Sequence, residues 1–263
     1  MKIQNTFKAN VIWGSLGFSL AIIAALLFDT QQTISYLAAA KAFIFSQFSW
    51  FYILLSAFFL FFLLFLALGR YGDIKLGSDE EEPEFKLSSW IALLFTSGIG
   101  IGIVFLGVAE PLSHFLSPIG EYEKVRTALF FSIFHWSISA WAIYGLIALT
   151  IAYFGFRYKL PFSLRSCFYP LLKEKINGKV GDIIDILGIC TTLFGVVATL
   201  GYSAIRLAAA FHSMHLLDNS LYLVPLILVS VFIIAILISL QGIANGFRIL
   251  SELNLGVTFL FML

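Results

Sequence analysis

The sequence is poor in charged residues. Only 12% of its 263 residues are Asp, Glu, Lys or Arg, whereas 60% are hydrophobic and the mean hydropathy is +0.97. A soluble domain carries roughly 25% charged residues. The shortage of charge therefore excludes an ordinary soluble domain. Because no stretch alternates polar and apolar residues like a strand, the sequence predicts an all-α integral membrane protein.

Cysteine is also scarce, and Cys167 and Cys190 form no C-x-x-C or Cys/His pattern that would predict a metal or redox site. We interpret both as small packing residues. The net charge of +1 comes without a basic cluster, so nucleic acid is not an expected partner. Glu110 and His114 are four residues apart, but no third ligand or nucleophile lies at matching depth. The sequence therefore predicts no catalytic residue, no metal site and no enzyme.

Long apolar runs are what the sequence has in abundance. A membrane-spanning helix needs roughly 20 residues. Six runs come near or exceed this length, at residues 11–28, 50–69, 90–108, 128–154, 183–211 and 221–240. A seventh run starts at residues 255–263, which amounts to about 13 Å of helix against a hydrocarbon thickness of about 30 Å. From this shortfall we expect a truncated gene product or a fragment.

The charges between the runs predict an orientation. Twelve of the 16 Lys and Arg residues precede the first run, lie in loops 70–87 and 155–182, or lie near Arg248. Three fall on the opposite side, at Lys41, Lys124 and Arg126. By the positive-inside rule, the N-terminus and loop 155–182 are expected in the cytoplasm.

Glycines interrupt the third run. Gly98, Gly100 and Gly102 stand two residues apart, and each costs a helix interior about 1 kcal/mol relative to alanine. One interpretation is close helix packing, but packing favours small residues four apart on one face. Spacing of two favours a broken helix, which in membranes lines a cavity and in many transporters binds substrate and ion. A phosphate-binding loop is not expected, because no strand precedes the glycines.

Aromatic residues mark the fourth run. On a continuous helix, Trp136, Trp141 and Tyr144 would fall within an arc of about 140°. Such a cluster can hold a quaternary ammonium group by cation–π attraction, although aromatics that face lipid or the membrane interface are the slightly favoured alternative. The fifth run carries a stripe of small residues that favours helix packing, while a threonine hydroxyl on it could still join an ion site: Gly188, Thr192, Gly195 and Thr199.

Several stretches in this order resemble the betaine/carnitine/choline transporter (BCCT) family. They are RYGDIKLG at 70–77, EPEF at 82–85, SW at 89–90, the glycine segment at 98–111, HWSISAWAIY at 135–144, GDIIDIL at 181–187 and SELN at 251–254. The resemblance implies a LeuT-type fold with two leading helices in residues 1–69 and most of a first inverted repeat in residues 88–263. It also implies sodium coupling and a homotrimer in many members.

The resemblance assigns site residues one by one. Trp136, Trp141 and Tyr144 match three members of an aromatic substrate box, which raises the cage interpretation above its alternative. The glycine run matches an unwound segment that contacts substrate through Gly98, Ile99, Gly100 and Gly102. Backbone carbonyls of Thr96 and Ile99 match one sodium site, and Thr192 matches a second. Na⁺ is therefore the coupling ion that the resemblance implies, with no other cofactor.

Some positions depart from the family pattern. Val196 replaces a second threonine of the second sodium site, Leu106 replaces an aromatic residue and Ala140 replaces a proline. Some proton-coupled members of the family have an acidic residue at the position of Gly102. Because Gly102 has no carboxylate, the resemblance favours sodium over protons as the coupling ion.

From these observations we expect a secondary active transporter of the bacterial inner membrane. Embedded in the lipid bilayer, it would take up glycine betaine, choline or carnitine, which are small quaternary ammonium compounds. The alternative is a truncated, transport-incompetent remnant of such a transporter.

Overall fold

The computed structural model describes residues 8–98, 101–117, 123–217, 222–240 and 243–262. These residues form helices, and no strand occurs among them. The helices in chain order are α1 (Ala9–Phe28), α2 (Thr30–Leu68), α3 (Leu87–Gly98), α4 (Ile101–Leu116), α5 (Lys124–His135), α6 (Ile138–Ala152), η1 (Tyr153–Arg157), α7 (Leu164–Cys167), α8 (Tyr169–Leu172), η2 (Lys173–Asn177), α9 (Lys179–Ser213), α10 (Leu223–Leu240) and α11 (Ile243–Met262). The all-α prediction is confirmed within the described part of the chain.

Two compact units divide the chain. The first contains residues 1–81 and 133–194, and the second contains residues 82–132 and 195–263. Within the described residues, five stretches are long and apolar enough to cross a membrane: Ala9–Phe28, Thr30–Leu68, Lys124–Arg157, Lys179–Ser213 and Leu223–Leu240. They overlap five of the six predicted runs. The remaining run, at 90–108, corresponds to α3 and the beginning of α4.

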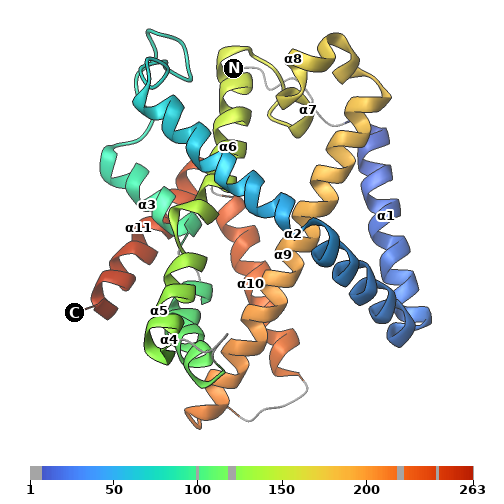
Figure 1. Cartoon of the computed structure of the whole chain (residues 1–263), viewed down its shortest axis with the longest axis vertical. Helices are drawn as coiled ribbons and strands as arrows, with labels where there is room; N and C mark the ends of the chain where they lie inside the picture. Colours follow the sequence, from blue (N-terminus) through green and yellow to red (C-terminus); the bar gives the residue numbers. More distant parts are fainter. Residues whose placement is uncertain (1–7, 99–100, 118–122, 218–221, 241–242, 263) are drawn as a thin grey trace. The chain divides into compact units, whose positions relative to one another are not determined.

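In the first unit, α1 packs along the first half of α9 through small residues (Figure 1). Val11, Ser15 and Ser19 recur every fourth residue and are buried. The Oγ of Ser15 donates to the carbonyl of Val11 at 2.8 Å, so burying the hydroxyl leaves it satisfied. A Cβ at Gly14 would lie 2.5 Å from Cδ1 of Ile186, so any larger residue there would require the Ile186 side chain to move.

Helix α2 begins 20 residues earlier than the predicted run. Asp29 caps it, because its Oδ1 accepts a hydrogen bond from the backbone N–H of Gln32 at 2.9 Å. No glycine or proline follows before Gly69, so nothing in the sequence ends the helix sooner. Its 39 residues extend about 58 Å, well beyond the hydrocarbon thickness of a bilayer. Lys41, expected in a loop, therefore lies within a helix.

The fourth predicted run, 128–154, is not one continuous helix. It divides into α5 and α6 at Trp136 and Ser137. Ser137 has an extended backbone (φ −75°, ψ 171°) and immediately precedes α6. Serine is favoured at this position because its short polar side chain competes with helical hydrogen bonding. The expectation of a continuous helix through the aromatic residues is wrong.

In the second unit, α3 and α11 lie side by side (Figure 1). Polar residues join them: the Ser89 Oγ donates to Glu252 Oε1 at 2.6 Å, and the Thr96 Oγ1 donates to the Ser251 carbonyl at 3.3 Å. Helix α11 begins at Ile243 and is 20 residues long, or about 30 Å. The prediction that only nine residues of a seventh helix are present is therefore wrong.

Ala204 and Ala208 of α9 pack against Leu223 and Ile227 of α10.

Candidate functional site

Because of the helix break, the three predicted cage residues do not lie on one helix. Trp136 lies in the turn after α5, whereas Trp141 and Tyr144 lie on α6. The turn closes through the backbone N–H of Ser137, which donates to the Phe134 carbonyl at 3.2 Å. The 140° arc predicted for one helix does not apply, because the backbone direction changes before Trp141.

Two of the three rings form a pair. The ring centroids of Trp141 and Tyr144 are 6.0 Å apart with planes tilted by 44°. The Trp141 Nε1–H donates to the Trp136 carbonyl at 3.3 Å, which ties the indole to the break. The Trp136 ring itself stacks on His135, with centroids 5.1 Å apart. Trp141 is 36% exposed and Tyr144 is 70% exposed, so both side chains of this pair reach the surface of the described structure.

The glycine segment is described in part. Gly98 is the last residue of α3, and Ile101 and Gly102 are the first residues of α4. The prediction of non-helical backbone across 98–102 is wrong at these three residues, and Ile99 and Gly100 lie outside the described residues. The segment therefore contributes two helix ends to the second unit, whereas the aromatic residues belong to the first.

The predicted ion ligands have the following surroundings. The Thr96 side chain faces α11, because its Oγ1 accepts from Nδ2 of Asn254 at 3.3 Å. The Thr192 Oγ1 donates to the Gly188 carbonyl at 2.9 Å and lies on an exposed part of α9. A hydroxyl that donates in this way keeps its oxygen lone pairs for an ion. Neither observation assigns a sodium site.

Sequence reasoning missed a buried ionic cluster in the first unit. Arg165 is 3% exposed, and its Nε donates to Asp185 Oδ2 at 2.5 Å. Its Nη1 donates to Asp182 Oδ1 at 3.1 Å, and the Lys8 Nζ reaches the same oxygen at 3.1 Å. The cluster joins the start of α1, helix α7 and the start of α9. Asp182 and Asp185 are three residues apart on one helix face, which was the available signal.

Glu110 and His114 also meet, with Oε1 and Nε2 3.7 Å apart. Within the described residues, no group of three His, Cys, Asp or Glu side chains could hold a metal ion. The ring of His114 lies 5.5 Å from that of Phe131, so this pair belongs to the packing of α4 and α5.

Comparison with known proteins decides the family. Residues 10–263 match the model of the BCCT, betaine/carnitine/choline family transporters. The chain belongs to the BCCT family. Together with its apolar helices, this makes it a multi-pass membrane protein of a transporter family, and the resemblance seen in the sequence is confirmed.

Three similar proteins are longer than this chain. It is 48% identical to an uncharacterized transporter of Haemophilus influenzae, over 100% of this chain and 40% of that protein. It is 40% identical to an osmo-dependent choline transporter of Acinetobacter baylyi, over 81% of this chain and 32% of that protein. It is 41% identical to a glycine betaine transporter of Bacillus subtilis, over 89% and 47%. The chain thus spans less than half the length of these relatives.

Proposed function

We propose that this chain is part of a secondary active transporter that takes up quaternary ammonium compounds, with glycine betaine, choline and carnitine as the candidate substrates. The observation that carries the proposal is the exposed Trp141–Tyr144 pair beside the helix break, in a chain of the BCCT family. Relatives named as choline and glycine betaine transporters support the same substrate class.

The aromatic pair supplies the chemistry for a trimethylammonium head. Such a cation cannot donate hydrogen bonds, so a ring face that carries negative charge density is its natural partner. The hydrogen bond from Trp141 Nε1 to the Trp136 carbonyl fixes the indole, so less side-chain freedom is lost when the substrate binds. In this proposal Trp136 supplies a third ring, and the backbone of the 98–102 segment contacts the rest of the substrate.

Further features of the proposal rest on the family. The fold would be of the LeuT type, with two leading helices in residues 1–69 and most of a first inverted repeat in residues 88–263. Transport would follow an alternating-access mechanism, with sodium held by Thr96, Ile99 and Thr192. The assembly would be a homotrimer. Positive charges in loop 155–182 support an inner-membrane protein with a cytoplasmic N-terminus.

The test is radiolabelled betaine and choline uptake, with and without sodium, in a bacterium that lacks osmolyte transporters. Because the chain covers less than half of its relatives, it is assayed alone and joined to the second half of a homologous transporter. We expect sodium-driven accumulation from the joined protein. Accumulation of substrate by the short chain alone would contradict the expectation that it is too short to transport. No accumulation by either the short chain or the joined protein would favour the alternative of a transport-incompetent remnant.

The cage is tested by Trp141→Ala in the joined protein. A desolvated cation–π contact is worth about 2 kcal/mol, so apparent affinity should fall tenfold or more. Trp141→Phe keeps a ring and should lose less. Trp50→Ala is the matched control, because Trp50 is 61% exposed on α2 and lies outside the proposed cage. Equal effects of Trp141→Ala and Trp50→Ala would contradict the cage.

A further inference from the structure

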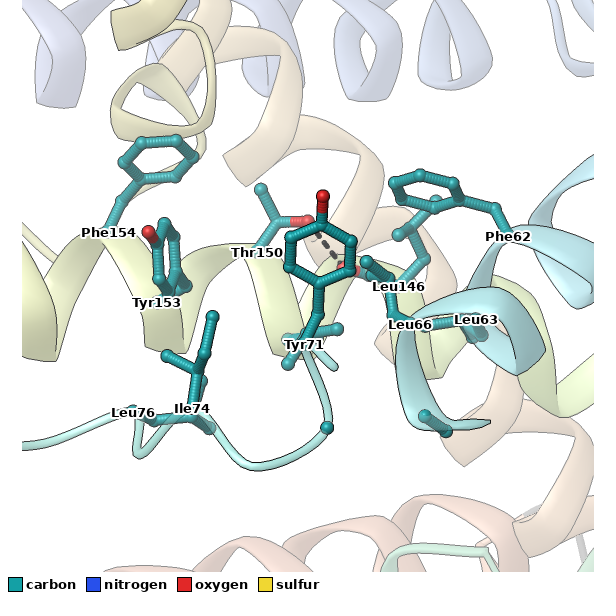
Figure 2. Close-up of a pocket in the computed structure, with 13 residues that line it drawn as sticks. Phe62, Leu63, Leu66, Tyr71, Ile74, Leu76, Leu146, Thr150, Tyr153 and Phe154 are labelled. Carbon is teal, nitrogen blue, oxygen red and sulfur yellow. Dashed lines mark hydrogen bonds between the residues drawn. The ribbon is translucent and has the colours of Figure 1, made fainter. Parts of the chain in front are cut away.

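A cavity of about 710 Å³ lies in the first unit, where α2 and α6 end. Figure 2 shows its walls. Leu63 and Leu66 come from α2, Leu146 and Leu149 come from α6, and the segment after α2 contributes Tyr71 and Ile74. We call it the α2–α6 cavity. Its size is within the range of sites for small organic ligands, about 300–1,000 Å³.

The interior of the α2–α6 cavity is apolar. None of its lining side chains is charged. The polar groups are hydroxyls, and the Oγ1 of Thr150 already donates to the Leu146 carbonyl at 2.6 Å, as the dashed line in Figure 2 marks. A zwitterion such as betaine would have to bury its carboxylate there without a charged partner, which is costly. The lining therefore favours a hydrocarbon ligand.

The rim of the cavity is basic where the apolar helices end. Arg70 follows the last residue of α2 by two positions and is exposed. Its guanidinium lies 5.2 Å from the ring centroid of Tyr71 and donates to the Tyr71 hydroxyl at 3.3 Å. Membrane helices end where hydrocarbon gives way to lipid head groups, and anionic head groups attract basic side chains at that level. The apolar lining thus complements a hydrocarbon chain, and Arg70 at the rim complements a phosphate group.

One wall of the cavity is held in place by ion-pair and backbone contacts. The Nη1 of Arg157 lies 2.7 Å from Asp79 Oδ1 and donates to the carbonyls of Gly77 and Lys75 at 3.0 and 3.3 Å. The Lys75 Nζ donates to the Asp79 carbonyl at 2.7 Å. These contacts join residues 75–79, which follow Tyr71 and Ile74, to η1 at the end of α6, so this wall is held beside the cavity without a ligand.

We propose that the α2–α6 cavity binds one acyl chain of a bilayer phospholipid, whose phosphate lies against Arg70. The size, the uncharged lining, the basic rim and the position at the ends of two membrane helices together support this occupant. The site is separate from the Trp141–Tyr144 pair, and none of its lining residues is a proposed substrate residue.

The experiment uses the chain in vesicles of phosphatidylethanolamine and phosphatidylglycerol that contain a phospholipid with a diazirine on one acyl chain. After illumination, mass spectrometry locates the adducts. We expect them on residues 62–76 and 146–154. Leu149→Trp fills the cavity and should lower the yield there at least fivefold. Ile147→Trp is the control, because Ile147 is 47% exposed on α6 and does not line the cavity.

Two further measurements separate the alternatives. Arg70→Gln should lower the yield roughly fivefold for the phospholipid probe but not for a monoacylglycerol with the same diazirine chain, because only the first carries phosphate. Ala67→Phe is a second filling variant in case Leu149→Trp does not remain monodisperse. Adducts spread evenly over exposed faces and insensitive to both filling variants would overturn the proposal. Displacement by millimolar betaine or choline would also overturn it, in favour of a cation site.

Discussion

Removal of the Asp185 carboxylate should destabilise the first unit more than any change of an exposed charge. Asp185 accepts from both the backbone N–H of Arg165, at 2.9 Å, and the Arg165 Nε, at 2.5 Å. Arg165 is 3% exposed, so its guanidinium cannot turn to water. In Asp185→Ala it would retain Asp182, at 3.1 Å, and the Ile176 carbonyl, at 3.4 Å.

The magnitude follows from this geometry. Removing one partner of a buried ion pair costs about 3–5 kcal/mol, because the remaining charge stays buried. Asp182 still compensates part of the charge in the variant, so the lower end of the range, about 3 kcal/mol, applies to the free energy of unfolding. This corresponds to roughly a hundredfold change in the unfolding equilibrium constant. Replacing both partners, as in Arg165→Met with Asp185→Leu, should restore most of the stability.

Unfolding is measured in mixed micelles with increasing SDS, followed by tryptophan fluorescence. Asp73→Ala is the control, because Asp73 is an exposed carboxylate in the same unit. The reasoning is wrong if Asp185→Ala loses less than about 1 kcal/mol, the value typical of exposed pairs. It is also wrong if the double variant is no more stable than Asp185→Ala.

Other predictions concern loops and packing. Arg157 lowers the pKa of Asp79, first through a hydrogen bond and then through its charge. Because the pKa of Asp79 is lower in the folded state than in the unfolded state, its ionised carboxylate stabilises the fold at pH values above the unfolded-state pKa. The Tm difference between the chain and Asp79→Asn should therefore persist above about pH 5 and be lost progressively as the pH falls below about 4. In right-side-out cells, Lys173→Cys should resist an impermeant maleimide and react after permeabilisation; labelling from outside would contradict the orientation. Burial raises the pKa of the Cys167 thiol, so it should react more slowly at neutral pH than the exposed cysteine at 173, and equal rates would refute this. Ala208→Leu should cost about 1–3 kcal/mol in SDS unfolding by overpacking α9 against α10, whereas no loss would show that the contact is loose.

The sequence alone determined the class of the protein. The sequence has too few charges for a soluble domain, and its apolar runs are long enough to cross a membrane. These features predict an all-helical membrane protein, because a helix pairs its own backbone N–H and C=O groups where the bilayer offers no water. The ordered motifs fixed the BCCT family. The start and end of α10 were also close to the predicted run, since apolar length and flanking polar residues are local features.

Tertiary contacts decided what local composition could not. The break at Ser137 was hidden inside an apolar run, because one serine costs a helix little and the surrounding fold determines whether the helix is interrupted there. Helix α11 already begins at Ile243, although Glu252 places a charge within its apolar sequence. The fold accommodates this carboxylate because the Ser89 Oγ of α3 donates a hydrogen bond to it at 2.6 Å. Arg165 counted only as a loop charge in the sequence. Its burial depends on Asp185, 20 residues away, and only the folded chain brings the two together.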